Sequence, residues 1–141
     1  MAEIEAPQLE LSAAEANSSN RMAIEQARLR QFFPRVAFVA IGSNVTAAAG
    51  TIDTHAGNTY AVRVQLDRFP YSLPSVVVVD YVIHPEAPHR YKDGSLCIMR
   101  VGQWRFHFTV ALVLAKTAIW LGKYEIWKRN GHHWPGRGQS H

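Results

Sequence analysis

The sequence contains a single cysteine, Cys97, among its 141 residues. One thiol can form no disulfide within the chain, and it excludes the paired-cysteine patterns of zinc and redox motifs. A reduced thiol suits a reducing compartment, so we expect a cytoplasmic protein. Any thiol chemistry in this chain must use Cys97.

Signals for secretion and membrane insertion are also missing. The first 20 residues are acidic and polar, without the basic start and apolar stretch of a signal peptide. The longest apolar run, residues 108–121, is interrupted by Thr109, Lys116 and Thr117 and is shorter than the roughly 20 residues that cross a bilayer. We therefore expect neither export nor a membrane partner.

Concentrated basic charge is lacking as well. The formal net charge is +4 and the basic residues are scattered along the chain. Their one modest cluster consists of Lys123, Lys128, Arg129 and Arg137. From this pattern we expect no specific nucleic-acid partner.

Metal-ligand spacing is absent too. His132, His133 and His141 lie at spacings that match no zinc motif, and no carboxylates lie near them in the sequence. We therefore expect no metal and no other cofactor.

The residues that are present fit one folded domain. Hydrophobic residues make up 48% of the chain and charged residues 18%, and no repeat or Gly/Ser linker is visible. We expect residues 1–11 to form a flexible leader and residues 12–141 a single domain. Ser12 and Glu15 can form a capping box, and the polar residues after them move the expected start of the main helix toward Asn20.

A helix followed by a strand meander is predicted for the first half of the chain. Apolar residues at helical spacing run from Met22 to Phe32 or Phe33, and Pro34 ends the helix. Residues 60–66 alternate apolar and polar side chains, as in a strand with one exposed face. Further strand candidates are residues 36–41, 51–54 and 76–79. Together they predict an antiparallel meander of about four strands.

The second half predicts a long loop and a second helix. Periodicity is lost from Asp80 to Cys97, and loops held by a scaffold often carry function. Thr109 can cap a helix that runs to about Arg129, with Asn130 and a glycine as its stop. The aromatic tail that follows is expected to pack back onto the domain.

The order of these elements and motifs resembles the ubiquitin-conjugating (E2) family. The segment FPYSLPSV at residues 69–76 resembles the family's YPxxPPxV stretch, and His84 with the following proline resembles the start of its HPN signature. GSLCI at residues 94–98 resembles the sequence around the family's active cysteine. Trp104 and Thr109 resemble the start of its next helix. The resemblance implies an α+β ubiquitin-conjugating fold: an N-terminal helix, a four-stranded antiparallel meander, an active-site loop and a C-terminal helix.

Two departures from the eukaryotic pattern point to a bacterial branch of that resemblance. Glu86 stands where the HPN signature has asparagine, and the chain after Cys97 is too short for both C-terminal helices, which implies a C-terminally truncated fold. Trp134 with the Pro-Gly after it and His141 resembles the W-P-G-x-x-x-x-H tail of bacterial E2-like proteins. Those proteins are encoded beside E1-like activating enzymes, ubiquitin-like proteins and JAB-type peptidases in antiphage operons.

The resemblance also implies a role for Cys97. In an E2, the active cysteine accepts a ubiquitin-like modifier from an E1-like enzyme as a thioester and passes it to an amine of a target protein. The thiolate is the nucleophilic form of cysteine, and each step passes through a tetrahedral oxyanion that a donor can stabilise. We expect Cys97 to lie exposed in a shallow groove, where a bulky protein tail can reach it.

Histidines are the candidates for the role of the missing asparagine. His89 lies eight positions before Cys97, the spacing that the asparagine has in the family. His84 is a rival, and the tail can carry His141 to the cleft. A neutral imidazole donates a hydrogen bond or relays a proton, whereas a charged one favours the thiolate, and the sequence leaves this choice open. Tyr91 either shields the thiol or fills space, and we favour the second role.

Two other functions stay open at this point. A catalytically silent E2 variant would bind a modifier or partner without using the thiol. A cysteine hydrolase would use Cys97 with His89, but papain-like nucleophiles open a helix, and the residues after Cys97 predict a loop.

Overall fold

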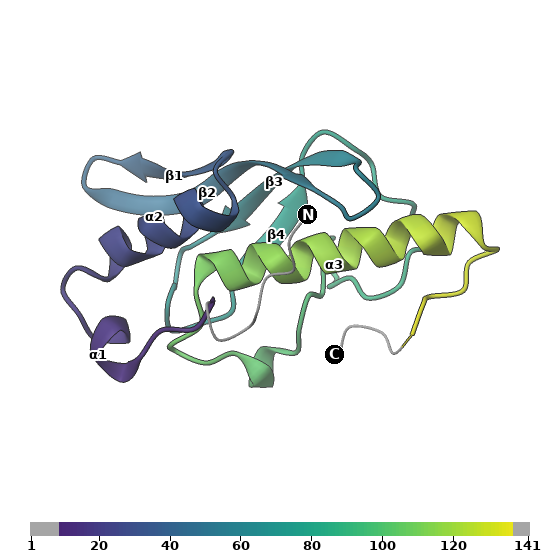
Figure 1. Cartoon of the computed structure of the whole chain (residues 1–141). Helices are drawn as coiled ribbons and strands as arrows, with labels where there is room; N and C mark the ends of the chain where they lie inside the picture. The colour runs from purple at the N-terminus through teal and green to yellow at the C-terminus, as the bar shows by residue number, and fades with distance from the viewer. Residues whose placement is uncertain (1–8, 137–141) are drawn as a thin grey trace.

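The computed structural model describes residues 9–136, which form a four-stranded sheet with helices packed on it (Figure 1). The helices are α1 (Ala13–Ala16), α2 (Arg21–Phe32), the 3-10 helix η2 (Val101–Gln103) and α3 (Val110–Arg129). The strands are β1 (Val36–Ile41), β2 (Asn44–Asp53), β3 (Thr59–Gln65) and β4 (Ser75–Val78). They pair antiparallel in the order β1-β2-β3-β4, which confirms the predicted α+β class and meander.

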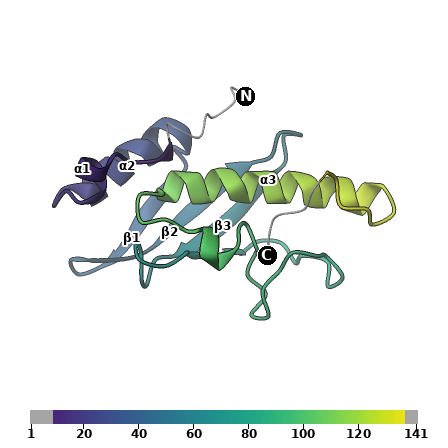
Figure 2. The ribbon, with the colours of Figure 1, turned by 90° about the horizontal axis from the view of Figure 1, so that it is seen from below.

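Helix α3 lies along one face of the sheet, and α2 lies beside the N-terminal half of α3 (Figures 1 and 2). The strands turn alternate side chains toward it: Tyr60, Val62 and Val64 of β3 are buried, as the alternation in residues 60–66 predicts. On α3, Trp120 and Tyr124 are fully buried. Burying one large apolar side chain stabilises a fold by about 1.5–3 kcal/mol, so this helix–sheet interface dominates the core.

Hydrogen bonds at the helix ends match the predicted signals. Ser12 Oγ accepts from the Glu15 amide at 3.1 Å, and Glu15 Oε1 accepts from the Ser12 amide at 3.0 Å, which completes the predicted capping box. Thr109 Oγ1 accepts from the Leu112 amide at 3.0 Å and starts α3. Both predicted helix starts are therefore confirmed.

Strand β2 is longer than the predicted residues 51–54, because it begins at Asn44. Its first part is rich in alanine, which shows no strand periodicity in a sequence. In the fold, however, Ala47 and Ala48 are fully buried between β1 and β3.

Residues 9–11, which we assigned to a flexible leader, are packed on the domain instead. Leu9 and Leu11 are only 2% and 5% exposed. The Leu11 amide donates to the His107 carbonyl at 2.9 Å, and the backbones of Glu10 and Phe108 form an isolated antiparallel β-bridge. The reason is the burial of two leucine side chains; residues 1–8 of the predicted leader lie outside the described residues.

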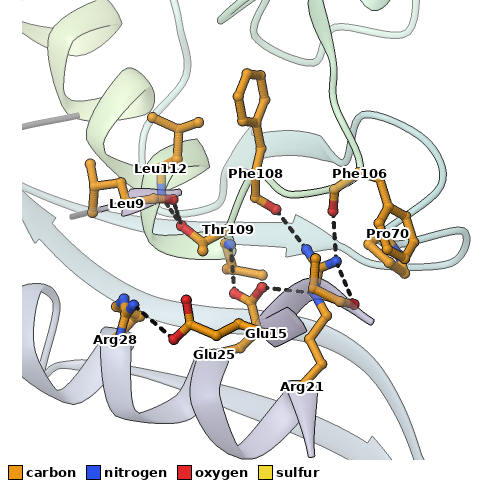
Figure 3. Close-up of polar contacts among 12 residues, drawn as sticks. Leu9, Glu15, Arg21, Glu25, Arg28, Pro70, Phe106, Phe108, Thr109 and Leu112 are labelled. Carbon is orange, nitrogen blue, oxygen red and sulfur yellow. Dashed lines mark hydrogen bonds and ion pairs between the residues drawn. The ribbon is translucent and has the colours of Figure 1, made fainter. Parts of the chain in front are cut away.

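A buried ion pair joins α2 to the start of α3 (Figure 3). Arg21 is 6% exposed and Glu25 is 0% exposed, with Arg21 Nε 3.2 Å from Glu25 Oε2. Glu25 Oε1 accepts from the amide of Val110, the first residue of α3, at 2.9 Å. The Arg21 guanidinium donates to the carbonyls of Phe106 and Phe108 at 2.6 and 2.9 Å. The pair thus satisfies backbone groups of α3 and of the segment before it.

Replacing Gly50 with alanine is expected to lower the free energy of unfolding by about 2 kcal/mol. A Cβ at Gly50 would lie 2.0 Å from the carbonyl oxygen of Arg35, so β1 would have to move. Urea denaturation measures the loss. Gly122→Ala in α3 is the control, because its Cβ meets nothing within 4 Å. It should raise stability by about 0.5–1 kcal/mol. Unchanged stability in Gly50→Ala would contradict the close approach of β1 and β2.

Within residues 9–136, no helix has both the length and the apolar character that a membrane crossing requires.

Candidate active site

The loop that carries Cys97 runs from the end of β4 to η2 and is fixed to α3 and β4 by hydrogen bonds. The His84 amide donates to the Tyr124 hydroxyl at 2.9 Å, near the start of the loop. Trp120 Nε1 donates to the His89 carbonyl at 2.9 Å, and the Leu96 amide donates to the Val76 carbonyl at 2.9 Å. These contacts hold a segment without regular structure in one conformation.

A tight turn precedes the thiol. The Tyr91 amide donates to the Ser95 carbonyl, and the Gly94 amide donates to the Tyr91 carbonyl, both at 2.9 Å. Asp93 Oδ1 accepts from the amide and the hydroxyl of Ser95 at 2.9 and 2.6 Å, and these bonds lower the pKa of the Asp93 carboxyl. Gly94 has a φ of 89°, which a glycine adopts without strain. Asp93 and Gly94 therefore shape the turn.

Cys97 is buried, contrary to our expectation of an exposed thiol in a shallow groove. The residue is 1% exposed, and its apolar neighbours Leu96 and Ile98 are buried with it. Its amide donates to the His89 carbonyl at 2.9 Å, and its Sγ lies 3.7 Å from the Met99 carbonyl oxygen. Desolvation by burial raises the pKa of the Cys97 thiol, so the thiol form is favoured near neutral pH.

Tyr91, for which we favoured filling space over shielding the thiol, bonds to the backbone beside Cys97. Its hydroxyl donates to the Met99 carbonyl at 2.7 Å, the same oxygen that Cys97 Sγ approaches. The nearby Tyr91 side chain lowers the pKa of the Cys97 thiol and partly opposes the effect of burial. The only sequence signal was a polar aromatic residue in the turn before the cysteine, and nothing in it indicates the direction of the hydroxyl.

His89 is brought to Cys97 through its backbone. Its carbonyl accepts from both the Cys97 amide and the Trp120 indole, each at 2.9 Å. Its φ is 59°, in the left-handed region that residues other than glycine rarely adopt. Its ring packs on Trp134, with ring centroids 5.0 Å apart.

His84 lies at the mouth of the loop. Its Nδ1 accepts from the Glu86 amide at 3.1 Å. Its ring meets those of Trp127 and His132 edge to face, at centroid distances of 5.4 and 5.2 Å. These contacts join the start of the loop to the end of α3. His141, the third candidate, lies outside the described residues.

Two other kinds of site were considered for this region: a papain-like hydrolase site at Cys97 and a metal site. No helix begins at Cys97, since the next helix, η2, starts at Val101, so the helix dipole that activates papain-like cysteines is not supplied there. Among residues 9–136, no three His, Cys, Asp or Glu side chains gather closely enough to hold a metal ion.

A sheet meander, a loop carrying the chain's one thiol and a long helix packed across the sheet define an E2-like protein of ubiquitin-conjugating fold. A family model described as Type II CBASS E2 protein matches residues 25–141. The chain belongs to this family and is thus a bacterial E2-like protein of antiphage operons. A comparison with curated proteins found no match.

Proposed function

We propose that this chain is an E2-like transferase of antiviral defence. Cys97 accepts a ubiquitin-like modifier from an E1-like enzyme as a thioester and passes it to an amine of a target protein, in the reducing cytoplasm. The single observation that carries the proposal is the position of Cys97: the only thiol of a CBASS E2 family chain ends the hydrogen-bonded loop between the sheet and α3.

The transfer consists of two exchanges at one carbonyl carbon. The Cys97 thiolate attacks the modifier's C-terminal carbonyl, and the bond to the E1 sulfur breaks as the E1 thiolate leaves. The target amine then attacks the new thioester, loses a proton, and Cys97 leaves as a thiolate. Because Cys97 is only 1% exposed, charging requires the loop to open when the E1-like enzyme docks, and exposure to water also removes the desolvation that raises the pKa of the thiol.

Each exchange passes through an oxyanion that a donor near Cys97 stabilises. One well-placed donor contributes about 3 kcal/mol to such a transition state. In place of the family's asparagine, this chain has His89 at the matching spacing and the Tyr91 hydroxyl beside the sulfur. We assign His89 the supporting role in discharge, with His84 and His141 as the alternative histidines.

His89→Ala should leave thioester formation within about twofold of the wild type and slow discharge to an amine by about 10²-fold, as expected when one oxyanion donor is removed. The measurement is a single-turnover discharge of the purified thioester to free lysine. His133→Ala, at an exposed histidine, is the control. Unchanged discharge in His89→Ala would move the role to His84 or His141.

A catalytically silent scaffold is the second candidate, and the burial of the thiol favours it. Cys97 is 1% exposed and its pKa is raised by desolvation, as for a cysteine that serves only as a small core residue. Such a protein would bind a modifier or partner without carrying it.

The test is incubation of the purified chain with its E1-like enzyme, the modifier and ATP. The transferase forms an adduct that thiol reductants cleave. The absence of an adduct under conditions in which the E1-like enzyme itself is charged would reject the transferase and leave the scaffold.

A further inference from the structure

The chain reverses direction directly after α3, in a segment that we call the C-terminal turn (residues 130–136). Gly131 and His132 both have left-handed φ angles, 83° and 72°. The Asn130 side chain donates to the His133 carbonyl at 2.9 Å and accepts from the His133 amide at 3.0 Å. These bonds fix the reversal and return the chain along α3.

Stacking on α3 anchors this turn. The His132 ring lies flat on Trp127, with centroids 3.9 Å apart and an interplanar angle of 9°. The His132 amide donates to the Trp127 carbonyl at 2.9 Å. The C-terminal turn therefore has a defined position on the last part of the helix.

The anchored turn places Trp134 against the active-site loop. Its ring packs on Trp120 of α3 and on His89, at centroid distances of 5.3 and 5.0 Å. Its Nε1 is buried and has no hydrogen-bond partner among residues 9–136. Leaving a buried donor unpaired is unfavourable, so packing against the two rings, not hydrogen bonding, holds Trp134 here.

His89 connects Trp134 to Cys97, because its ring packs on Trp134 and its backbone carbonyl accepts a hydrogen bond from the Cys97 amide. Its carbonyl holds the Cys97 amide and the Trp120 indole, and its φ of 59° is a conformation that surrounding contacts must maintain. With the backbone fixed, the ring of Trp134 is a contact that helps to orient the imidazole.

We propose that Trp134 is a positioning residue of the Cys97 site, acting through His89 to orient the imidazole and to keep the loop closed over the thiol. Its part in transfer rests on the proposed function, whereas its part in closing the loop does not. Loss of the ring has two consequences: the imidazole is misplaced during discharge, and the buried thiol becomes more accessible.

Trp134→Leu and Trp134→Phe test the proposal, because both keep an apolar side chain and only phenylalanine keeps a ring. His133→Ala is the matched control in the same turn, since the His133 side chain is exposed. One readout is discharge of the thioester to lysine. The other is alkylation of the uncharged protein by iodoacetamide, which reports on Cys97 alone because the chain has no other cysteine.

We expect Trp134→Leu to slow discharge by about tenfold and to speed alkylation by about tenfold, while charging, which needs an open loop, is no slower than in the wild type. Trp134→Phe and His133→Ala should resemble the wild type. In a His89→Ala background, Trp134→Leu should add nothing to either readout, since residues that act through one another are not additive.

Equal effects of Trp134→Leu in the wild-type and His89→Ala backgrounds would overturn the proposal. Unchanged discharge and alkylation in Trp134→Leu would do so too, as would a Trp134→Phe variant as impaired as Trp134→Leu. A fall in thermal stability large enough to explain both changes would also overturn it. If the wild type accepts no modifier, the proposed function fails, and the alkylation rates still decide whether Trp134 keeps the loop closed.

Discussion

Cys97→Ser is expected to convert the modifier adduct from a thioester that reductants cleave into an oxygen ester that they do not. Cys97→Ala should abolish the adduct, because the chain has no second thiol to replace the first. Serine is the weaker nucleophile, so its adduct should form more slowly. Electrophoresis with and without reductant, after incubation with the E1-like enzyme, modifier and ATP, measures both results.

Folding is the control for these variants. Cys97 is buried, so circular dichroism and thermal unfolding must show that serine and alanine leave the domain folded. Any covalent modifier adduct in folded Cys97→Ala would place the reaction at another residue. Full phage protection by Cys97→Ala in cells would favour the silent scaffold.

Arg21→Met is expected to lower the free energy of unfolding by about 3–5 kcal/mol, because it leaves the Glu25 carboxylate buried without the cation that pairs with it. The side chain of Glu25 is 0% exposed and depends on Arg21 and the Val110 amide for its hydrogen bonds. Urea unfolding followed by tryptophan fluorescence measures the loss. Arg21→Met with Glu25→Leu should recover only the part of the loss that comes from the buried charge, since the Val110 amide and the Phe106 and Phe108 carbonyls still lose their side-chain partners.

The loss in Arg21→Met should also depend on pH. Desolvation by burial raises the pKa of Glu25, and losing the attraction of Arg21 raises it further. A raised pKa contributes stability below the unfolded-state value of about 4.3, and this contribution is lost as pH rises through the folded-state pKa. Arg21→Met should therefore be closer to the wild type at about pH 4.5 than at pH 7.

Arg35→Met removes an exposed ion pair with Asp53 and is the control, which we expect to leave stability nearly unchanged. If Arg21→Met lowers the free energy of unfolding by the same amount at both pH values, Glu25 is not the charged, unpaired group that we infer.

The parts of the fold that could be predicted from the sequence are those that depend on residues close together along the chain. The alternation in residues 60–66, the Ser12 capping box and the Thr109 cap each follow from one periodicity or one hydrogen bond between near neighbours. Strand β2 was predicted too short because its alanines acquire strand character only from the strands on either side. Arg21 and Glu25 are four residues apart, a spacing typical of surface pairs, and tertiary contacts with the start of α3 and with the rings of Phe69 and Phe106 bury them.

The site was predictable in position but not in environment. The order of motifs indicates the loop and Cys97, because these depend on chain order. The thiol is 1% exposed in a loop where the Tyr91 hydroxyl turns toward the Met99 carbonyl and Trp134 packs on His89. Both contacts are tertiary, and no spacing along the chain encodes the direction of a side chain.

The most direct test of the central claim is the intact mass of the wild-type chain after incubation with the E1-like enzyme, modifier and ATP. We expect an increase equal to one modifier less one water, located on Cys97 by peptide mapping and removed by hydroxylamine or thiol reductant. An unchanged mass while the E1-like enzyme is charged, or an adduct located on another residue, would contradict it.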